Sequence, residues 1–339
     1  MDSLLEIRNL QTSFRTEDGT VRAVDNVSFD IRAGEVVGLV GESGCGKTAA
    51  SLSILQLLPT PPAVIEGGEI HFAGRDLLQL TPEQIRRIRG NEIAMIFQEP
   101  MTSLNPVYTI GNQLIETIQL HQKLDHRAAH ARAVEMLKLV GIPRAEEVIH
   151  EFPHRFSGGM RQRAMIAMAL SCNPRLLIAD EPTTALDVTI QAQILELMRE
   201  LRERIGMSIL FITHDLSVIA EMADRVVVMY SGKLVEQADV ESLFHDPQHP
   251  YTRGLIGSRP SADQEQDLEP TNGRKRLPFI RGSVPNPLRM PQGCPFHPRC
   301  DHAMPVCAQR MPERSELKPG HEVRCWLYEA HAPKPEVRP

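Results

Sequence analysis

The chain of 339 residues carries a net charge of −6 at pH 7, with an isoelectric point near 6.1. This acidic balance argues against a general affinity for nucleic acid. No stretch approaches the roughly 18 consecutive apolar residues of a membrane span, and the N-terminal MDSLLEIRNLQTSF lacks the basic and apolar regions of a signal peptide. We therefore expect a cytosolic chain that is long enough for two domains.

The first sixty or so residues predict three strands followed by a helix. Leu4–Phe14 alternates apolar and polar residues and predicts an edge strand, and Val21–Ile31 predicts a second strand. Glu35–Val40 is a short apolar run with β-branched residues, which favours a buried parallel strand. Ala49–Leu58 is a run of helix formers that ends at Pro59. The segment between this strand and this helix is the first candidate for a binding site.

That segment has the sequence GESGCGKT, which matches the pattern G-x-x-x-x-G-K-T of a phosphate-binding loop. Its glycines let the backbone curl with N–H groups pointing at an anion. Lys47 adds a cation for the β- and γ-phosphates, and Thr48 can ligate Mg²⁺. The flanking strand and helix place bound phosphate at a helix N-terminus, although a glycine-rich turn without a ligand is the alternative. The predicted nucleotide contacts are Gly41, Glu42, Ser43, Gly44, Cys45, Gly46, Lys47, Thr48 and Ala49.

A glutamine, Gln98, stands at the end of the second strand that the sequence predicts after this helix. Gly67–Phe72 predicts a strand, and Thr81 and Pro82 predict the N-cap and the first position of a helix. Ile93–Phe97 predicts a further buried strand, and Gln98 follows it directly. The amide of Gln98 could reach Mg²⁺ and a bound water, and so respond to the state of the nucleotide.

Ile110–Gly141 has apolar residues at helical spacing and predicts a small helical subdomain that reaches to about Ala169. Within it, Ser157, Gly158 and Gly159 precede a helix rich in Ala and Met. These residues predict a second anion site at a helix N-terminus. Because one chain holds one nucleotide, this site makes most sense facing the phosphate loop of another subunit. An ordinary glycine-rich N-cap is the alternative.

Acidic and histidine side chains follow two later strands. Leu176–Ala179 runs into Asp180 and Glu181, and Ile209–Thr213 runs into His214. Ligands of open α/β sheets gather at this edge. We expect Asp180 to hold Mg²⁺, Glu181 to orient and polarise the attacking water, and His214 to bond the γ-phosphate. The alternatives are a solvated acidic turn and a structural histidine.

Arg225–Tyr230 and Lys233–Glu236 predict a hairpin, and the composition changes after Gly257. The remainder is rich in Pro, Arg and Glu, which allows a disordered tail as one interpretation. Four clustered cysteines argue against that, and in a reducing cytosol they indicate a metal rather than disulfides. Their spacing fits neither the ferredoxin run nor paired C-x₂-C zinc motifs, so iron–sulfur, zinc and free thiols stay open. The four are Cys294, Cys300, Cys307 and Cys325.

Taken together, these motifs resemble those of the ATP-binding subunits of ABC transporters over roughly residues 4–255. GESGCGKT is similar to the Walker A motif, FSGGM to the family signature and LLIADE to the Walker B motif. Gln98, Ala185–Asp187 and His214 match the Q-loop, the D-loop and the switch histidine, and Phe14 matches the aromatic that stacks on adenine. The resemblance implies an α/β P-loop ABC ATPase fold with a RecA-like core, an antiparallel β subdomain and a helical subdomain.

A narrower resemblance is to the D-type ATPase subunit of dipeptide and oligopeptide permeases. It rests on FQEPMTSLNP around Gln98, on ADEPTTALDVTIQAQ from Ala179 to Gln193, and on HPYT at 249–252. It implies an ATPase that uses ATP and Mg²⁺ and pairs as a heterodimer with a second related ATPase. Its further partners would be two transmembrane permease subunits and a periplasmic or extracellular peptide-binding protein. The chain would be peripheral, at the cytoplasmic face of the inner membrane, with no nucleic acid partner.

The same resemblance divides the chain into a nucleotide-binding domain, 1–257, with its helical subdomain at about 99–169, and a small Cys-rich C-terminal domain, 258–339. The four cysteines of that domain are implied to bind a [4Fe–4S] cluster, with zinc as the alternative. Met160 departs from the Gln that many members have at the end of the signature, and it lacks an amide that could bond the opposite nucleotide. Cys45 stands at a variable position of the loop, where its side chain need not touch phosphate.

Two other functions fit the same motifs. An importer ATPase for nickel, glutathione or an oligosaccharide would carry them too, because the ATPase need not touch the cargo. Soluble ABC ATPases of DNA repair or of ribosomes also carry them, but they usually have two cassettes or a long insertion. This chain has one cassette and neither of those features.

Overall fold

The computed structural model describes residues 3–98, 103–184, 186–258 and 279–329. The strands are β1 (Ser3–Thr16), β2 (Gly19–Arg32), β3 (Val36–Val40), β4 (Ala63–Phe72), β5 (Arg75–Asp76), β6 (Ile93–Ile96), β7 (Leu176–Asp180), β8 (Ser208–Ile212), β9 (Arg225–Tyr230), β10 (Lys233–Asp239), β11 (Ser315–Lys318) and β12 (His321–Val323). The α-helices are α1 (Lys47–Ile54), α2 (Pro82–Ile88), α4 (Ile110–Gln122), α5 (His126–Leu139), α6 (Ala145–Val148), α7 (Gly158–Leu170), α8 (Val188–Ile205), α9 (Leu216–Met222), α10 (Val240–His245) and α11 (Pro250–Gly257).

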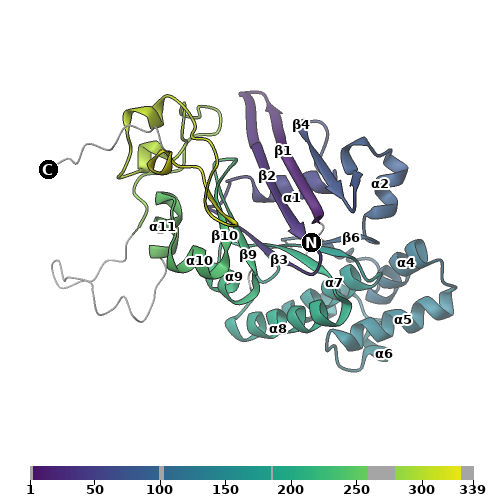
Figure 1. The fold of residues 1–339 in the computed structure, drawn as a ribbon. Helices are drawn as coiled ribbons and strands as arrows, with labels where there is room; N and C mark the ends of the chain where they lie inside the picture. The colour runs from purple at the N-terminus through teal and green to yellow at the C-terminus, as the bar shows by residue number, and fades with distance from the viewer. Residues whose placement is uncertain (1–2, 99–102, 185, 259–278, 330–339) are drawn as a thin grey trace.

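The larger sheet has the strand order β11-β12-β10-β9-β3-β8-β7-β6 (Figure 1). Strands β6, β7, β8, β3 and β9 are parallel neighbours, and β3, β7 and β8 are buried along their whole length. This confirms the buried strands that the apolar runs predict. Along β3, Val36 and Val40 join one core cluster while Val37 and Leu39 join the other, because successive side chains point to opposite faces. Both faces of this sheet are therefore covered.

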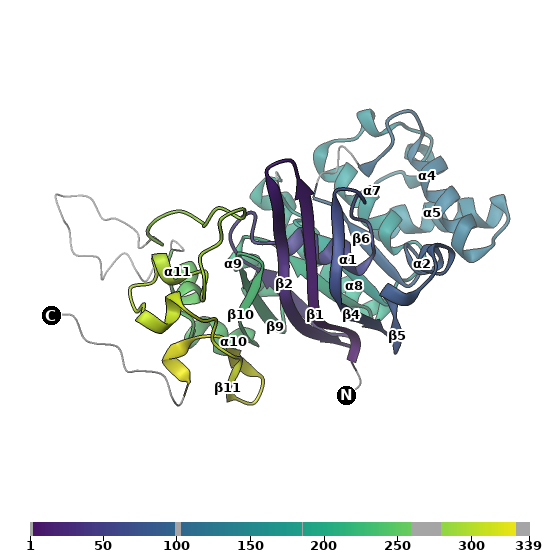
Figure 2. The ribbon, with the colours of Figure 1, turned by 90° about the horizontal axis from the view of Figure 1, so that it is seen from above.

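The smaller sheet is antiparallel, with the order β2-β1-β4-β5. The predicted edge position of Leu4–Phe14 is wrong, because β1 lies between β2 and β4. Its alternating pattern reflects one face turned to the core, where Leu5, Ile7 and Leu10 are buried. Helix α1 shares that core, so it lies between the two sheets (Figures 1 and 2).

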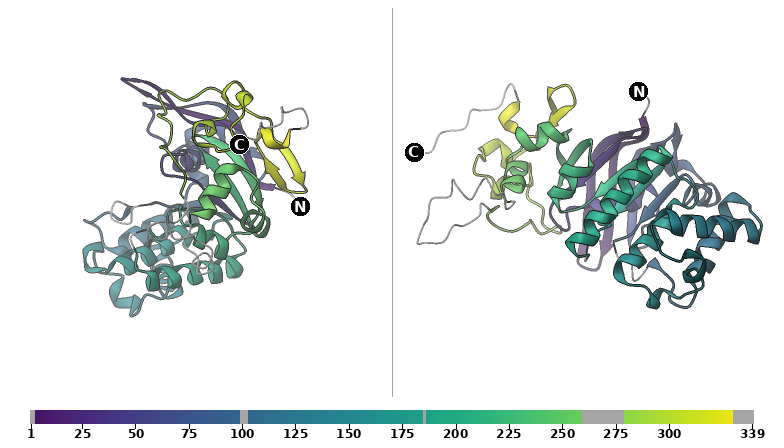
Figure 3. Two further views of the ribbon diagram at one scale, coloured as in Figure 1. Left: turned by 90° about the vertical axis from the view of Figure 1, so that its left-hand side faces the viewer. Right: turned by 90° about the horizontal axis from the view of Figure 1, so that it is seen from below.

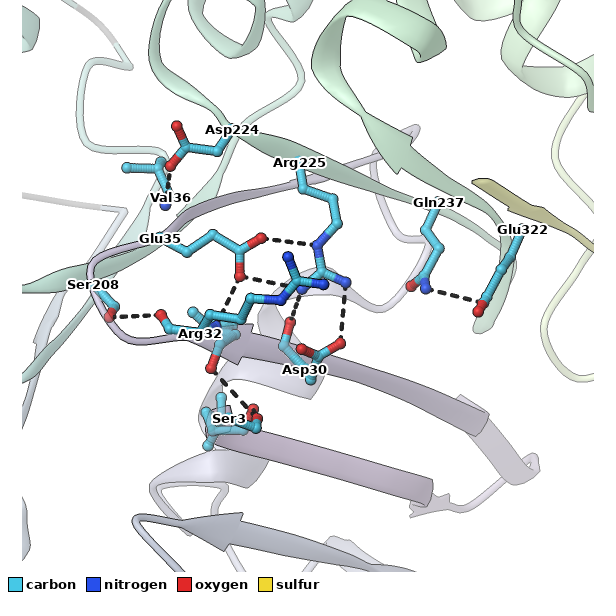
Figure 4. A network of polar contacts seen from close by, with 12 residues as sticks. Ser3, Asp30, Arg32, Glu35, Val36, Ser208, Asp224, Arg225, Gln237 and Glu322 are labelled. Atoms are coloured by element: carbon cyan, nitrogen blue, oxygen red, sulfur yellow. Dashed lines mark hydrogen bonds and ion pairs between the residues drawn. The ribbon is translucent and has the colours of Figure 1, made fainter. Parts of the chain in front are cut away.

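A buried arginine joins the two sheets (Figure 4). Arg225, the first residue of β9, donates to Glu35 Oε1 at 2.9 Å and to Asp30 Oδ1 at 3.0 Å. Asp30 belongs to β2, while Glu35 directly precedes β3. Nearby, the hydroxyl of Ser208 donates to the carbonyl of Arg32 at 3.0 Å. These contacts hold the end of β2 against the larger sheet.

The helices α4 to α7 form a subdomain beside β6 (Figure 2). The helical stretch predicted for 110–141 divides at Lys123, whose φ of 54° ends α4. Thr109 caps the start of α4, and Asp125 caps the start of α5 through its bond to the amide of Ala128. Across the described ranges, we find no helix with the length and hydropathy that crossing a bilayer requires.

Residues 279–329 pack against the end of the larger sheet (Figure 3). Strand β12 pairs with β10, and β11 pairs with β12, so this segment extends the sheet by two strands. Phe296 and Trp326 join the same core cluster as the strands β3 and β9. Glu236 on β10 is fully buried and accepts a hydrogen bond from His321 on β12 at 2.8 Å. The segment and the sheet thus share one hydrophobic core.

Candidate functional site

The glycine-rich loop connects β3 to α1, as the flanking patterns predict. Gly41 has a φ of 151° and Gly46 a φ of 102°, which are left-handed values that side chains rarely adopt. A Cβ atom would lie 2.2 Å from the carbonyl oxygen of Met229 at Gly41, and 2.1 Å from that of Ala23 at Gly46. Only glycine fits at these two positions, so the curled shape of the loop depends on them.

Lys47 lies over the loop and is only 7% exposed. Its ammonium group donates to the carbonyl oxygens of Gly41 at 2.8 Å and of Glu42 at 3.1 Å. Within the described ranges, the amides of Ser43 and Gly44 donate to no backbone carbonyl. Because these amides precede the N-terminus of α1, the loop offers N–H groups and a cation to an anion.

Asp180 ends β7 and is 2% exposed. Burial raises the pKa of its carboxyl group, and a hydrogen bond with Thr48 opposes that shift in part. Its Oδ1 atom has no hydrogen-bond partner among the described residues. A buried carboxylate oxygen without a partner, beside a hydroxyl group, is a donor set that suits a hard cation such as Mg²⁺.

Glu181 is the centre of a polar cluster. Its carboxylate is bonded to the Nδ1 atom of His214 at 3.1 Å and accepts from the amide of Gln98 at 3.0 Å. It also accepts from the hydroxyl of Thr184 at 2.9 Å, a contact that sequence reasoning missed. Burial favours a higher pKa for Glu181, but the hydrogen bonds with His214 and Thr184 outweigh it and hold the pKa below its ordinary value. Glu181 is therefore a carboxylate at neutral pH, held from three sides.

Ser157 caps the N-terminus of α7 and accepts a hydrogen bond from the amide of Met160 at 3.3 Å. Gly158 is exposed, and a Cβ atom at Gly159 would lie 3.0 Å from Ile190. No hydrogen bond joins Ser157 to the loop of its own chain in the part that the structure describes. The structure thus brings Asp180, Glu181, Gln98 and His214 together, and among the described residues no hydrogen bond joins Ser157 to them.

Two of the remaining predicted residues lie on β1 and α1, and the others lie outside the described ranges. Phe14 is half-buried on β1, paired with Val21 on β2 and with Ala63 on β4. Ala49 is half-buried in α1. Ala185 of the predicted D-loop, and residues 99–102 that follow Gln98, lie outside the described residues.

The four C-terminal cysteines line one small cavity with His249 and Trp326. None of them forms a disulfide. Burial raises the pKa values of Cys294 and Cys300 to about 11 and that of Cys325 to about 12. Nowhere in the described ranges are three or more His, Cys, Asp or Glu side chains grouped closely enough to hold a metal ion. Cys294, Cys300 and Cys325 are therefore neutral thiols at neutral pH.

Comparison with known proteins identifies two families in the chain. Residues 24–184 match the ABC transporter family, and residues 235–307 match the C-terminal region of oligopeptide and dipeptide transporters. An oligopeptide transport ATP-binding protein of Bacillus subtilis is 54% identical over 97% of this chain and 98% of its own length. A dipeptide transport ATP-binding protein of the same organism is 49% identical over 98% and 97%. A probable peptide ABC transporter ATP-binding protein of Sinorhizobium fredii is 54% identical over 96% and 95%.

Solved structures show the same fold. A dimeric ATP-binding cassette in a post-hydrolysis state with ADP and Pi bound superposes with a TM-score of 0.63 and 26% identity, over 70% of this chain and 98% of that one. An ABC transporter component of Clostridium perfringens gives a TM-score of 0.61 and 25% identity, over 75% and 96%. The α/β fold with its phosphate loop is therefore that of an ABC ATPase. On these motifs, this geometry and these relatives, the chain belongs to the ATP-binding proteins of peptide ABC transporters.

Proposed function

We propose that this chain hydrolyses ATP to energise the uptake of dipeptides or oligopeptides across the cytoplasmic membrane. The observation that carries the proposal is the cluster around Glu181, which stands next to the buried Asp180 at the edge of the sheet where the phosphate loop lies. The peptide cargo is supported by the match of residues 235–307 and by the names of the relatives.

In this proposal, Lys47 leaves the carbonyls of Gly41 and Glu42 and donates to the phosphates, together with the amides of the loop. Thr48, Gln98 and Asp180 would hold Mg²⁺, which when bound neutralises charge on the phosphate oxygens. Phe14 would stack on the adenine. The ionised Glu181 accepts a hydrogen bond from the attacking water and orients it, while Gln98 and His214 hold the carboxylate.

Hydrolysis in this proposal needs two cassettes. Ser157, Gly158 and Gly159 would bind the γ-phosphate on a second, related ATPase, forming a heterodimer. The dimeric state of a similar solved cassette supports this. Met160 lacks the amide of the common glutamine, so the site that this signature completes would be the weaker of the two.

The further partners that we propose are two transmembrane permease subunits and an external peptide-binding protein, with this chain on the cytoplasmic side. Residues 101–108 would contact a permease subunit, and of these Val107 is 70% exposed and Tyr108 51%. We also propose the division of the chain into residues 1–257, with a helical subdomain at about 99–169, and residues 258–339.

A substitution at Glu181 tests the catalytic role. Glu181→Gln keeps the shape and the contacts of the side chain but removes the carboxylate, so the assembled transporter should bind ATP and turn over at most about a hundredth as fast. Steady-state phosphate release and binding of a fluorescent ATP analogue measure the two effects. Glu203→Gln, an exposed residue of α8, is the matched control and should behave as wild type. Normal turnover by Glu181→Gln would remove Glu181 from this role.

We further propose that Cys294, Cys300, Cys307 and Cys325 hold a [4Fe–4S] cluster, with zinc as the competing metal. Four thiols around one cavity are soft donors of the type that either metal prefers, but in this structure they are not close enough together to bind one. Since the thiols of Cys294, Cys300 and Cys325 are protonated without metal, binding would release protons and draw the four sulfurs together.

Metal analysis of the full chain, purified without oxygen, tests this site. We expect about four iron atoms and matching sulfide per chain, lost in Cys307→Ser and kept in Cys172→Ser, whose buried thiol lies outside the cavity. Zinc in place of iron would contradict the [4Fe–4S] cluster but would support a metal site at these four cysteines. Equal metal content in the two variants would overturn the site itself.

A further inference from the structure

An arginine of the C-terminal segment reaches the phosphate loop. The guanidinium of Arg299 donates to Glu42 Oε2 at 2.7 Å and to Glu42 Oε1 at 3.1 Å. Glu42 is the second residue of the loop, and 257 residues separate the two partners. This two-pronged ion pair is a direct link between residues 279–329 and the loop.

Arg299 is fixed in place by its other contacts. Its Nε atom donates to the carbonyl of Arg281 at 2.9 Å, and its terminal nitrogens also reach the hydroxyl of Tyr230 at 3.2 Å and the carbonyl of Ile280 at 3.4 Å. The side chain is 5% exposed, and its guanidinium carbon lies 5.8 Å from the centre of the Tyr230 ring. A guanidinium held by five hydrogen bonds cannot follow a moving loop, so it acts as a fixed anchor.

Glu42 is held at its backbone as well. Its N–H group donates to the hydroxyl of Tyr251 on α11 at 2.8 Å, and its carbonyl oxygen accepts from Lys47 at 3.1 Å. When Lys47 turns to a phosphate, that last contact is lost. The bonds to Tyr251 and Arg299 then remain to hold this end of the loop.

We propose that Arg299 is a positioning residue for nucleotide binding, which keeps the phosphate loop in its receptive shape through the carboxylate of Glu42. The proposal rests on the proposed function only in that ATP occupies this loop. On this proposal, residues 279–329 help to hold the phosphate loop in the shape that binds nucleotide. By linkage, nucleotide in the loop also steadies the segment that carries Arg299.

The test uses four variants of the full chain, with Glu42→Gln as a fifth in reserve. Arg299→Ala removes the anchor, and Arg299→Lys keeps the charge but cannot form the two-pronged ion pair. The double variant Glu42→Arg with Arg299→Glu exchanges the two charges. Arg289→Ala is the matched control, because Arg289 is an exposed arginine of the same segment with no side-chain hydrogen bond or ion pair in the described ranges. The Kd for a fluorescent ATP analogue is measured on the chain, and the KM for ATP and kcat on the assembled transporter.

We expect Arg299→Ala to raise the Kd and KM about tenfold and to change kcat at saturating ATP by less than about threefold. Arg299→Lys should lie between Arg299→Ala and wild type, and the reversed pair should regain part of the affinity that Arg299→Ala loses. If Arg299→Ala does not fold, Arg299→Lys and Glu42→Gln carry the test, with a Kd raised at least about threefold in each.

A purely structural role would lower the melting temperature and leave the Kd of the folded chain unchanged. A Kd for Arg299→Ala within about twofold of that for Arg289→Ala would therefore overturn the inference. This outcome differs from failure of the proposed function, in which the wild-type chain itself would bind no ATP analogue at Lys47.

Discussion

Asp180 is a residue whose placement opposes stability. Its carboxylate is 2% exposed and one of its oxygens has no partner among the described residues, which disfavours the charged form. The raised pKa of Asp180 determines how the stability of the folded chain changes with pH. Folding is not penalised in acid, where the group is protonated in both states, and the penalty sets in as the pH rises through the raised pKa.

We therefore expect Asp180→Asn to stabilise the nucleotide-free chain at pH 7.5 while it abolishes hydrolysis. The amide carries no charge, so the melting temperature without nucleotide and with EDTA should rise by about 1–3 °C. The gain should shrink as the pH falls and wild-type Asp180 becomes protonated. Differential scanning calorimetry measures both shifts. Asp18→Asn, in the exposed turn between β1 and β2, is the control, and a lower melting temperature for Asp180→Asn would contradict the account.

Most of the residues around Glu181 could be predicted from the sequence, but two contacts could not. Gln98, Asp180, Glu181 and His214 were predictable because each lies at the end of an apolar strand or within two residues of it, and parallel strands end at one edge. Thr184 was not singled out, although its place three residues after Glu181 puts it within reach of that carboxylate. No local pattern connects Arg299 with Glu42, because their contact depends on how the C-terminal segment packs.

At the scale of elements, the junction of the two sheets depends on Arg225. Its side chain is 10% exposed and bonds to carboxylates on either side of the turn between β2 and β3. Arg225→Ala should destabilise the chain by about 2–3 kcal/mol, because it removes the cation from the largely buried Glu35 and the half-buried Asp30. Urea unfolding followed by circular dichroism measures the loss.

The matched control for that junction is Arg15→Ala, an exposed arginine of the smaller sheet with no side-chain bond in the described ranges. It should cost less than about 0.5 kcal/mol. Equal losses in Arg225→Ala and Arg15→Ala would mean that the junction is not held by this network.

Elements with long apolar patterns were predictable, and their neighbours were not. The strands β3, β7 and β8 and the hairpin of β9 and β10 lie where the sequence predicts them. The alternation in Leu4–Phe14 shows that one face of β1 is buried, but it carries no information on how many strands flank it. Likewise, the polar composition after Gly257 hides the pairing of β12 with β10, because β12 has only three residues.

At the scale of the whole molecule, the single tryptophan reports on the C-terminal segment. Trp326 is 7% exposed, and its indole N–H donates to the carbonyl of Arg310 at 2.9 Å. Since this segment shares a core and a sheet with the rest of the chain, its fluorescence change in urea should coincide with the loss of circular dichroism.

Saturating ATP analogue should shift both of these transitions together to higher urea. Trp326→Phe is the control that assigns the signal, since tyrosine alone should then remain. A fluorescence transition that precedes the loss of circular dichroism, and that ignores nucleotide, would mean that the C-terminal segment unfolds independently.

The pairing of Glu236 with His321 has a consequence for a chain still emerging from the ribosome. Glu236 is fully buried and also accepts from the amides of Gln248 and His249, so its carboxylate is set in place well before its histidine is synthesised. Until His321 is synthesised, strand β10 has no partner on that side and Glu236 lacks the hydrogen bond from that histidine. Strand β10 therefore gains its neighbour in the sheet only after residues 321–323 have been synthesised.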